Sequence, residues 1–165
     1  MNIKRVMRHF STGRAAVRRV FPAGTLAAIE RAIRETEMLH DGQIRFAVEP
    51  ALELAPLLSD QTARQRAIEV FSQLRVWDTE HNNGVLIYLL LADRDVEIIA
   101  DRGIHVRLGT EVWEAICRGM EAAFREGHFE AGVLAGIHAV GEHLTHHFPA
   151  RSGKPNEMPD SPVLL

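Results

Sequence analysis

Residues 76–103 read VWDTEHNNGVLIYLLLADRDVEIIADRG, and this stretch decides the fold. A polar loop over residues 77–83 leads into a continuous apolar run, 85–92, which has the length of a buried strand. A short acidic turn and a second extended run, 96–100, follow. Two strand-like runs around a short polar turn predict a β-hairpin. Such a hairpin would bring the loop 77–83 beside Asp101 and Arg102, where the second strand ends.

The flanking sequence predicts helices and one further strand. Thr25 is a typical N-cap, Gly127 is a typical helix-terminating glycine, and Ile44, Phe46 and Val48 alternate as in a strand. The expected elements outside the hairpin are a helix over 25–39, a strand over 43–49, irregular chain or one short turn over 51–58, a helix from 59 or 60 to 74, a loop over 103–109, and helices over 110–126 and 129–146.

These elements predict an α/β fold. A helix joins the strand 43–49 to the first hairpin strand, so the two should be parallel with a right-handed crossover. The hairpin adds a third, antiparallel strand. Neither hairpin strand has a polar face, which indicates that helices cover the sheet on both sides. We therefore expect a three-layer α/β/α sandwich with a small central mixed sheet, in the order helix-strand-helix-strand-strand-helix-helix.

The composition is that of one globular domain. The chain has 165 residues, of which 46% are hydrophobic and 25% charged, and we assign the domain to residues 23–148. Residues 149–165 are rich in proline and polar residues and predict a disordered tail. Cys117 is the single cysteine, so no internal disulfide can form, and we expect it to be buried.

The sequence also bears on location. No apolar run reaches the roughly 18 residues that span a bilayer, and the N-terminus lacks the apolar core of a signal peptide. We therefore expect a cytoplasmic protein. The alternative within the cytoplasm is a peripheral location at a membrane.

The first 22 residues form a basic arm or short helix. Six lysines and arginines lie within residues 1–20, without any acidic residue, whereas 13 basic and 22 acidic residues follow. Such an arm can attract an anionic membrane surface or an unknown protein partner. It can equally remain solvated or dock on the chain's own acidic surface. We expect no sequence-specific binding of nucleic acid.

Polar residues should converge at one end of the sheet. Oxygen ligands of the kind that Ca²⁺ or Mg²⁺ prefers are Asp41, Asp78, Glu80 and Asp101. The accompanying binding loop comprises Trp77, Thr79, Asn82, Asn83, Arg102 and His105. The alternative is structural: Asp78 and Thr79 cap the loop, Asn82 and Asn83 supply turn geometry, and Asp101 pairs with Arg102. Asp93 and Asp95 are typical of a hairpin tip.

Other chemistry finds less support. His143 and His147 share a helix face at the i, i+4 spacing that zinc can use, but a frayed polar helix end explains them equally. The chain lacks a Gly-x-Ser-x-Gly elbow, a phosphate-binding glycine loop and a dinucleotide fingerprint. No catalytic residue can be assigned from these patterns.

The hairpin block resembles the TPM domain family. The residues that carry the resemblance are Asn83-Gly84-Val85-Leu86, Asp93-Arg94, Val96-Glu97-Ile98 and Arg102-Gly103. Three further blocks, Gly42–Ile44, Ala67–Phe71 and Phe124–Gly132, are similar to other parts of the family pattern, so the resemblance covers roughly residues 25–147.

The resemblance implies an α/β/α fold, a divalent-cation site, and for some relatives an acid phosphatase activity. Other relatives are linked to the assembly, repair or modulation of membrane complexes. Many relatives have a glycine-rich loop where this chain has Val76-Trp77-Asp78-Thr79, and many carry a signal peptide and a membrane anchor, which this chain is expected to lack. Two functions follow: a non-catalytic binding or adaptor module with a divalent-cation site, and a metal-dependent phosphoester hydrolase.

Overall fold

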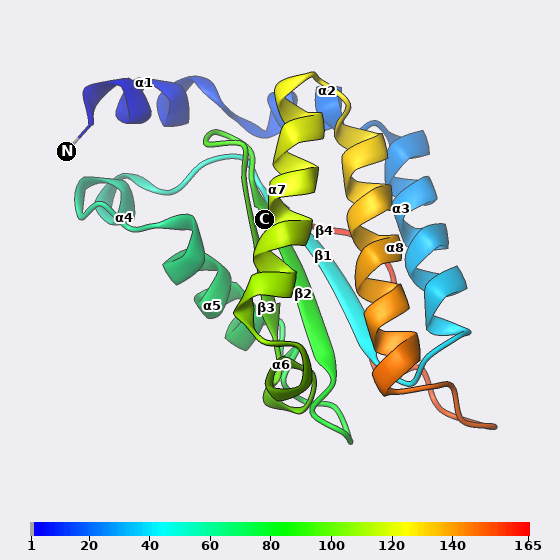
Figure 1. Cartoon of the computed structure of the whole chain (residues 1–165). Helices are drawn as coiled ribbons and strands as arrows, with labels where there is room; N and C mark the ends of the chain where they lie inside the picture. Colours follow the sequence, from blue (N-terminus) through cyan, green and yellow to red (C-terminus); the bar gives the residue numbers. More distant parts are fainter. Residues whose placement is uncertain (1) are drawn as a thin grey trace.

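A single sheet of four strands, in the order β3-β2-β1-β4, organises the molecule (Figure 1). The computed structural model describes residues 2–165. Its elements are α1 (Ile3–Ser11), α2 (Arg14–Val20), α3 (Ala23–Glu37), β1 (Gln43–Glu49), α4 (Leu54–Leu58), α5 (Ala63–Gln73), β2 (Gly84–Leu90), β3 (Asp95–Ala100), α6 (Arg102–Leu108), α7 (Thr110–Arg125), α8 (Phe129–His147) and β4 (Val163–Leu164).

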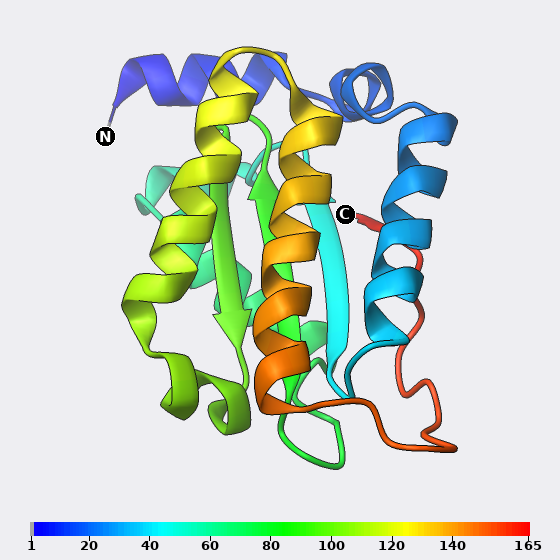
Figure 2. The ribbon, with the colours of Figure 1, turned by 45° about the vertical axis from the view of Figure 1, so that its right-hand side comes forward.

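The expected three-layer α/β/α architecture is confirmed. Helices α3, α7 and α8 cover one face of the sheet, and α4 and α5 cover the other (Figure 2). The side chains of β2 alternate between the two cores, with Val85, Ile87 and Leu89 on the larger side. Leu86, Tyr88 and Leu90 point to the smaller side. Every residue of β2 is buried, which is why the sheet needs helices on both faces.

The predicted strand pairing is also confirmed. β1 runs parallel to β2, with Ile44 opposite Val85, and β3 runs antiparallel to β2, with Ile98 opposite Ile87. The hairpin turn contains Arg94 at a positive φ of 52°. β3 has no neighbour on its outer side and forms one edge of the sheet.

A buried polar network joins β1, β2 and α5. Arg66 donates two hydrogen bonds to Glu49, at 2.9 and 3.0 Å, and the Tyr88 hydroxyl donates to the same carboxylate at 2.6 Å. Burial, and next the hydrogen bond to Glu49, raises the pKa of Tyr88. The bidentate geometry offsets the desolvation of the buried charges. The network fixes α5 against the sheet.

The C-terminal residues follow a defined path, contrary to the expected disordered tail over 149–165. They run along the outer side of β1 and end in β4, which pairs in parallel with Ala47 and Val48. The side chain of Met158 is buried in the smaller core. The tail therefore supplies the fourth strand, which the sequence analysis did not predict.

Polar side chains of β1 explain why the tail is held. The Gln43 side-chain oxygen accepts hydrogen bonds from the N–H groups of Glu157 and Met158, at 3.1 and 2.9 Å. Arg45 donates to the Pro159 and Ser161 carbonyls. Gln43 and Arg45 are buried, and buried polar groups require such partners.

Several boundaries differ from the predictions. Residues 102–108, expected as a loop, form α6, and Leu54–Leu58 forms the short helix α4. Helix α5 begins at Ala63 because Thr62 and Gln65 form a capping box. The basic arm forms two helices, α1 and α2. None of the described helices combines the length and the apolar character that a membrane-spanning segment requires.

A substitution of Gly84, the first residue of β2, tests the close packing of the hairpin. A Cβ atom there would lie 2.0 Å from the Val76 carbonyl oxygen, so the backbone would have to shift. Gly84→Ala should therefore lower the free energy of unfolding by about 3 kcal/mol or more, measured by urea denaturation. Gly24→Ala is the matched control, because no heavy atom lies within 4 Å of its added Cβ. Equal stability of the two variants would contradict this packing.

Candidate functional site

The polar end of the sheet is assembled as the hairpin predicts. The Asp101 N–H donates to the Gly84 carbonyl at 2.9 Å. Gly103 lies so close to the loop that an added Cβ would come within 2.6 Å of the His81 and Asn82 carbonyl oxygens. Loop 77–83 and the exit of β3 are therefore neighbours.

The start of β1 joins this polar end through Asp41. Asn83 donates from its side chain to the Asp41 carbonyl at 3.2 Å. The Asp41 carboxylate is bound by Arg151, at 2.8 and 3.0 Å. His81 lies 3.6 Å from the same carboxylate, and Glu80 lies 3.6 Å from Arg151. Arg151 belongs to the tail that was expected to be disordered, so sequence reasoning missed it.

The four carboxylates predicted as metal ligands do not converge. Asp78 is exposed and pairs with Arg75 at 2.7 Å, while Asp101 accepts from the Arg102 N–H as the N-cap of α6. Among the described residues, no group of three or more His, Cys, Asp or Glu side chains is placed to hold a metal ion. The same holds for the zinc site considered at His143 and His147, since neither belongs to such a group. The His143 ring instead contacts Trp113 edge-on, with ring centroids 6.4 Å apart.

The remaining loop residues have structural partners. Trp77 is about half exposed, with the Arg75 guanidinium 5.7 Å from its ring. The Thr79 hydroxyl accepts from the Asn83 N–H at 3.1 Å, and Asn82 adopts a positive φ of 51°. These contacts agree with the structural interpretation of the loop.

Two oxygen atoms at this end have no hydrogen-bond partner among the described residues. Asn83 Oδ1 and Asp101 Oδ2 are both buried, and the residues lie at neighbouring ends of β2 and β3. Buried acceptors without partners are rare and call for an explanation. The carboxylates of Asp41 and Asp78, in contrast, are each paired with an arginine.

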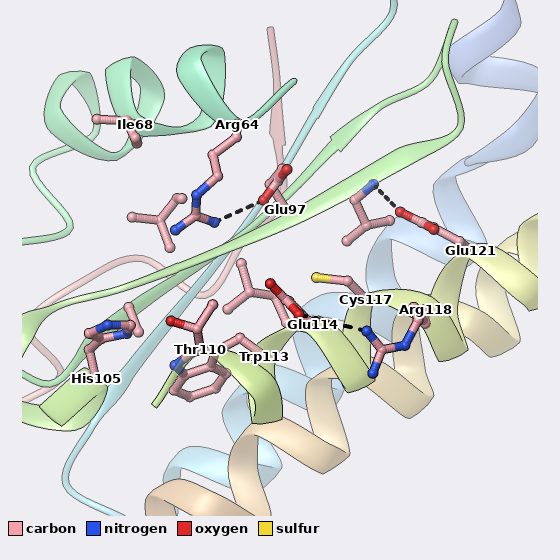
Figure 3. Close-up of a pocket in the computed structure, with 14 residues that line it drawn as sticks. Arg64, Ile68, Glu97, His105, Thr110, Trp113, Glu114, Cys117, Arg118 and Glu121 are labelled. Carbon is pink, nitrogen blue, oxygen red and sulfur yellow. Dashed lines mark hydrogen bonds and ion pairs between the residues drawn. The ribbon is translucent and has the colours of Figure 1, made fainter. Parts of the chain in front are cut away.

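A second candidate site is a groove along the open edge of β3 (Figure 3). Its volume is about 360 Å³. Arg64 and Ile68 of α5 lie on one side, residues of α7 lie on the other, and β3 runs between them. Of the predicted site residues, only His105 lines it. Sequence reasoning missed this groove, because its walls come from three separated segments.

The backbone of β3 offers hydrogen-bonding groups to the groove. Asp101 bonds to β2, so by the alternation of an antiparallel ladder the backbone groups of Val96, Ile98 and Ala100 point away from β2. Helix α7 satisfies one of these N–H groups, because Val96 donates to Glu121 at 3.3 Å. Burial raises the pKa of the Cys117 thiol to about 12, so it is no reactive thiolate.

Trp113 provides an unused donor beside this edge. Its side chain lines the groove and is 4% exposed, and its buried indole N–H has no acceptor among the described residues. The charged groups nearby neutralise each other in pairs, Arg64 with Glu97 at 2.9 Å and Arg118 with Glu114 at 3.8 Å. The groove therefore combines apolar walls, backbone groups and one buried donor.

The largest pKa shifts of carboxyl and imidazole groups lie outside the predicted loop. Burial raises the pKa of Glu37 to about 7, although its hydrogen bond from the Ile44 N–H opposes this shift. Burial, with repulsion from Glu97, raises the pKa of Asp95 to about 6. Burial, with repulsion from Lys154, lowers the pKa of His40 to about 4. These groups sit under the tail or at the hairpin tip.

Comparisons with known proteins agree with the fold. Residues 17–143 match the model of the TPM domain. The NMR structure of the BA42 protein from the psychrophilic bacterium Bizionia argentinensis has a TM-score of 0.77 and 29% identity, over 88% of this chain and 95% of that one. The N-terminal domain of a P. gingivalis protein has a TM-score of 0.64 and 20% identity, over 80% and 83%. No curated protein matches the chain.

Because the family model covers most of the chain, the protein belongs to the TPM domain family. The resemblance drawn from the hairpin block is thereby confirmed. The two similar structures share the fold of this chain.

Glu37 makes the stability depend on pH. Its pKa of about 7 in the folded chain exceeds the ordinary value of 4.5, so the folded state retains a proton that the unfolded state loses. The contribution of Glu37 to stability should therefore fall by about 3 kcal/mol as pH rises from about 4.5 to 7, and then level off. Asp95 adds to this fall, whereas His40, whose pKa is lowered, opposes it, so the Glu37 contribution is read as the difference between the wild type and a variant. Glu37→Gln keeps an acceptor for Ile44 and should flatten this fall in urea denaturation. The control Glu35→Gln, on an exposed position of α3, should retain the wild-type slope.

Proposed function

We propose that this TPM-domain protein is a non-catalytic binding module, an adaptor that holds an extended segment of a partner protein in the groove along β3. The observation that carries the proposal is the Trp113 indole N–H, which is buried, without an acceptor, and placed beside an open strand edge. Because this N–H is buried, a ligand carbonyl oxygen would satisfy it after a small shift of the groove wall on binding.

An extended peptide has the complementary groups. Its carbonyl oxygens can accept from Trp113, and its N–H groups can donate to the outward carbonyls of β3, as in strand addition to a sheet edge. Its apolar side chains would cover Ile68 and the walls of the groove. Because the rim charges are already paired, the groove favours a neutral main chain over a phosphate group.

The cytoplasmic location is a prediction from the sequence. A cytoplasmic adaptor, in contact with a membrane surface, is consistent with the proposal. The partner protein is defined here only by the extended conformation that the groove would bind.

Peptide selection on the full chain tests the groove. Peptides enriched from a random nonapeptide library should bind the wild type, and Trp113→Phe should weaken their binding about 3- to 10-fold, measured by fluorescence polarisation, because one buried hydrogen bond is lost. Trp77→Phe makes the same chemical change at an exposed site at the polar end and should leave the affinity unchanged. Backbone NMR shifts on binding should centre on residues 96–100. Equal affinity of the wild type and Trp113→Phe, or shifts confined to loop 77–83, would refute the proposal.

A second candidate function is a metal-dependent phosphoester hydrolase at the polar end of the sheet. The buried acceptors Asn83 Oδ1 and Asp101 Oδ2 favour it, because they are free to bind a divalent cation. A bound Ca²⁺ or Mg²⁺ would polarise a phosphoryl oxygen and lower the pKa of a bound water. In this candidate, the exposed Arg102 would bind the phosphate, and His81 or His105 would move protons. The same cation can also be structural in an adaptor.

A calcium and magnesium titration separates these roles. If the two acceptors bind a cation, the midpoint of thermal unfolding should rise with cation concentration, by an amount equivalent to about 2.7 kcal/mol at 100 times the dissociation constant. Asp101→Asn should abolish the rise, whereas Asp78→Asn should retain it, since Asp78 is exposed and paired with Arg75. Cation-dependent hydrolysis of p-nitrophenyl phosphate that Asp101→Asn removes would support the hydrolase. A midpoint that neither cation moves would exclude a cation site on these two oxygens.

A further inference from the structure

Helix α1 presents an apolar stripe to solvent. Ile3, Met7 and Phe10 are 71%, 66% and 69% exposed, and their i, i+4, i+7 spacing puts them on one face of the helix. Exposing three large apolar side chains to water on one helix face is energetically unfavourable, so such a face is characteristic of a docking surface.

The opposite face holds α1 on the domain. Asp93 at the hairpin tip accepts from Arg5 at 2.9 Å and from Arg8, and His9 lies 3.2 Å from it. Burial raises the pKa of Asp93, but the hydrogen bonds from Arg5 and Arg8 outweigh it and hold the pKa below its ordinary value. His9, which is buried, also accepts from the Leu52 N–H at 3.0 Å. The inner face is thus fixed, and the stripe points outward.

Basic residues surround the stripe. Lys4 flanks it on α1 and is exposed, whereas Arg8 is already bound to Asp93. Arg14, Arg18 and Arg19 of α2 are also exposed, and the first acidic residue of the sequence is Glu30. An apolar stripe with a cationic rim is the pattern of a helix that lies in the interface of an anionic membrane.

We propose that α1 docks the protein on an anionic lipid surface, with Ile3, Met7 and Phe10 inserted among the lipids and the basic residues of α1 and α2 on the headgroups. Charge selects this occupant. A second copy of the chain would bring two cationic rims together, whereas anionic headgroups neutralise the rim. This site is separate from the groove of the proposed function and does not depend on it.

The placement of α1 suits this role. It lies across the hairpin-tip end of the domain, whereas α6 and the loop 77–83 lie at the other end (Figures 1 and 2). Docking through α1 would therefore leave the polar end of the sheet directed away from the lipid. The inward contacts to Asp93 would persist in the bound state.

Cosedimentation with vesicles tests the proposal on the full chain. The wild type should bind vesicles of phosphatidylglycerol and phosphatidylcholine, mixed about 1:2, at low salt, and should bind pure phosphatidylcholine at least about tenfold more weakly. Met7→Ser combined with Phe10→Ser should weaken binding to the anionic vesicles at least about tenfold, because the inserted area is lost. The matched control is Val106→Ser, since Val106 is 77% exposed on α6 at the far end.

The outcomes separate insertion from other modes of contact. Unchanged thermal unfolding of the double variant shows that the fold is intact, and Arg14→Ser with Arg18→Ser, which keeps the stripe, tests the cationic rim independently. Binding that depends on both the stripe and the rim supports the proposal. Wild-type chain that stays in the supernatant, binding that the Met7 and Phe10 substitutions leave unchanged, or a stripe-dependent dimer without vesicle binding would overturn it. A stripe that captures a protein instead of lipid would give the first of these results.

Discussion

The structure depends on the burial of β2 from both sides. All its residues are buried, and it pairs with β1 on one side and β3 on the other, so water reaches neither its faces nor its edges. Helices must therefore cover both faces, which produces the three layers. The candidate sites accordingly lie outside β2, at the two ends of the sheet and at the outer edge of β3. The polar loop, helix α1 and the groove occupy these places.

The polar side chains of β1 impose a second constraint. Gln43, Arg45 and Glu49 project from a strand that is buried on both faces, and each would be destabilising without a partner. Helix α5 supplies Arg66 to Glu49, and the C-terminal residues supply backbone groups to the other two. The tail is thus ordered by hydrogen bonds to the strand beside it, although its own sequence has little apolar surface to bury. Its order in turn places Arg151 on Asp41 and removes that carboxylate from the set of available ligands.

Sequence reasoning succeeded where a local pattern determines the outcome. The hairpin, the parallel crossover and the helices follow from apolar periodicity, capping and glycine positions within short windows. It failed where the interacting residues are far apart in the sequence. The order of the tail could have been predicted only if Gln43 and Arg45 had been recognised as buried residues that require partners. An arginine within an otherwise apolar strand was the available signal. The groove was missed because its walls come from α5, β3 and α7, which are separated along the chain. The hairpin predicted that loop 77–83 lies beside Asp101. It did not predict in which direction each of the candidate carboxylates points.

Charge pairing is the physical argument that favours binding over hydrolysis. Stabilising a phosphoryl group requires cations whose charge is not already neutralised, yet Arg75, Arg151 and Arg64 each lie against a carboxylate at 2.7–2.9 Å, which leaves the exposed Arg102 as the candidate phosphate ligand at the polar end. Recognition of a peptide main chain has the opposite requirement. It needs apolar walls and a few directed hydrogen-bonding groups in a desolvated groove, where paired charges neither attract nor repel the ligand. The edge of β3 beside Trp113 meets that requirement. On α1 and α2, the exposed cations Lys4, Arg14, Arg18 and Arg19 instead lie around an apolar stripe, where a lipid surface rather than a single phosphate has the shape to meet them.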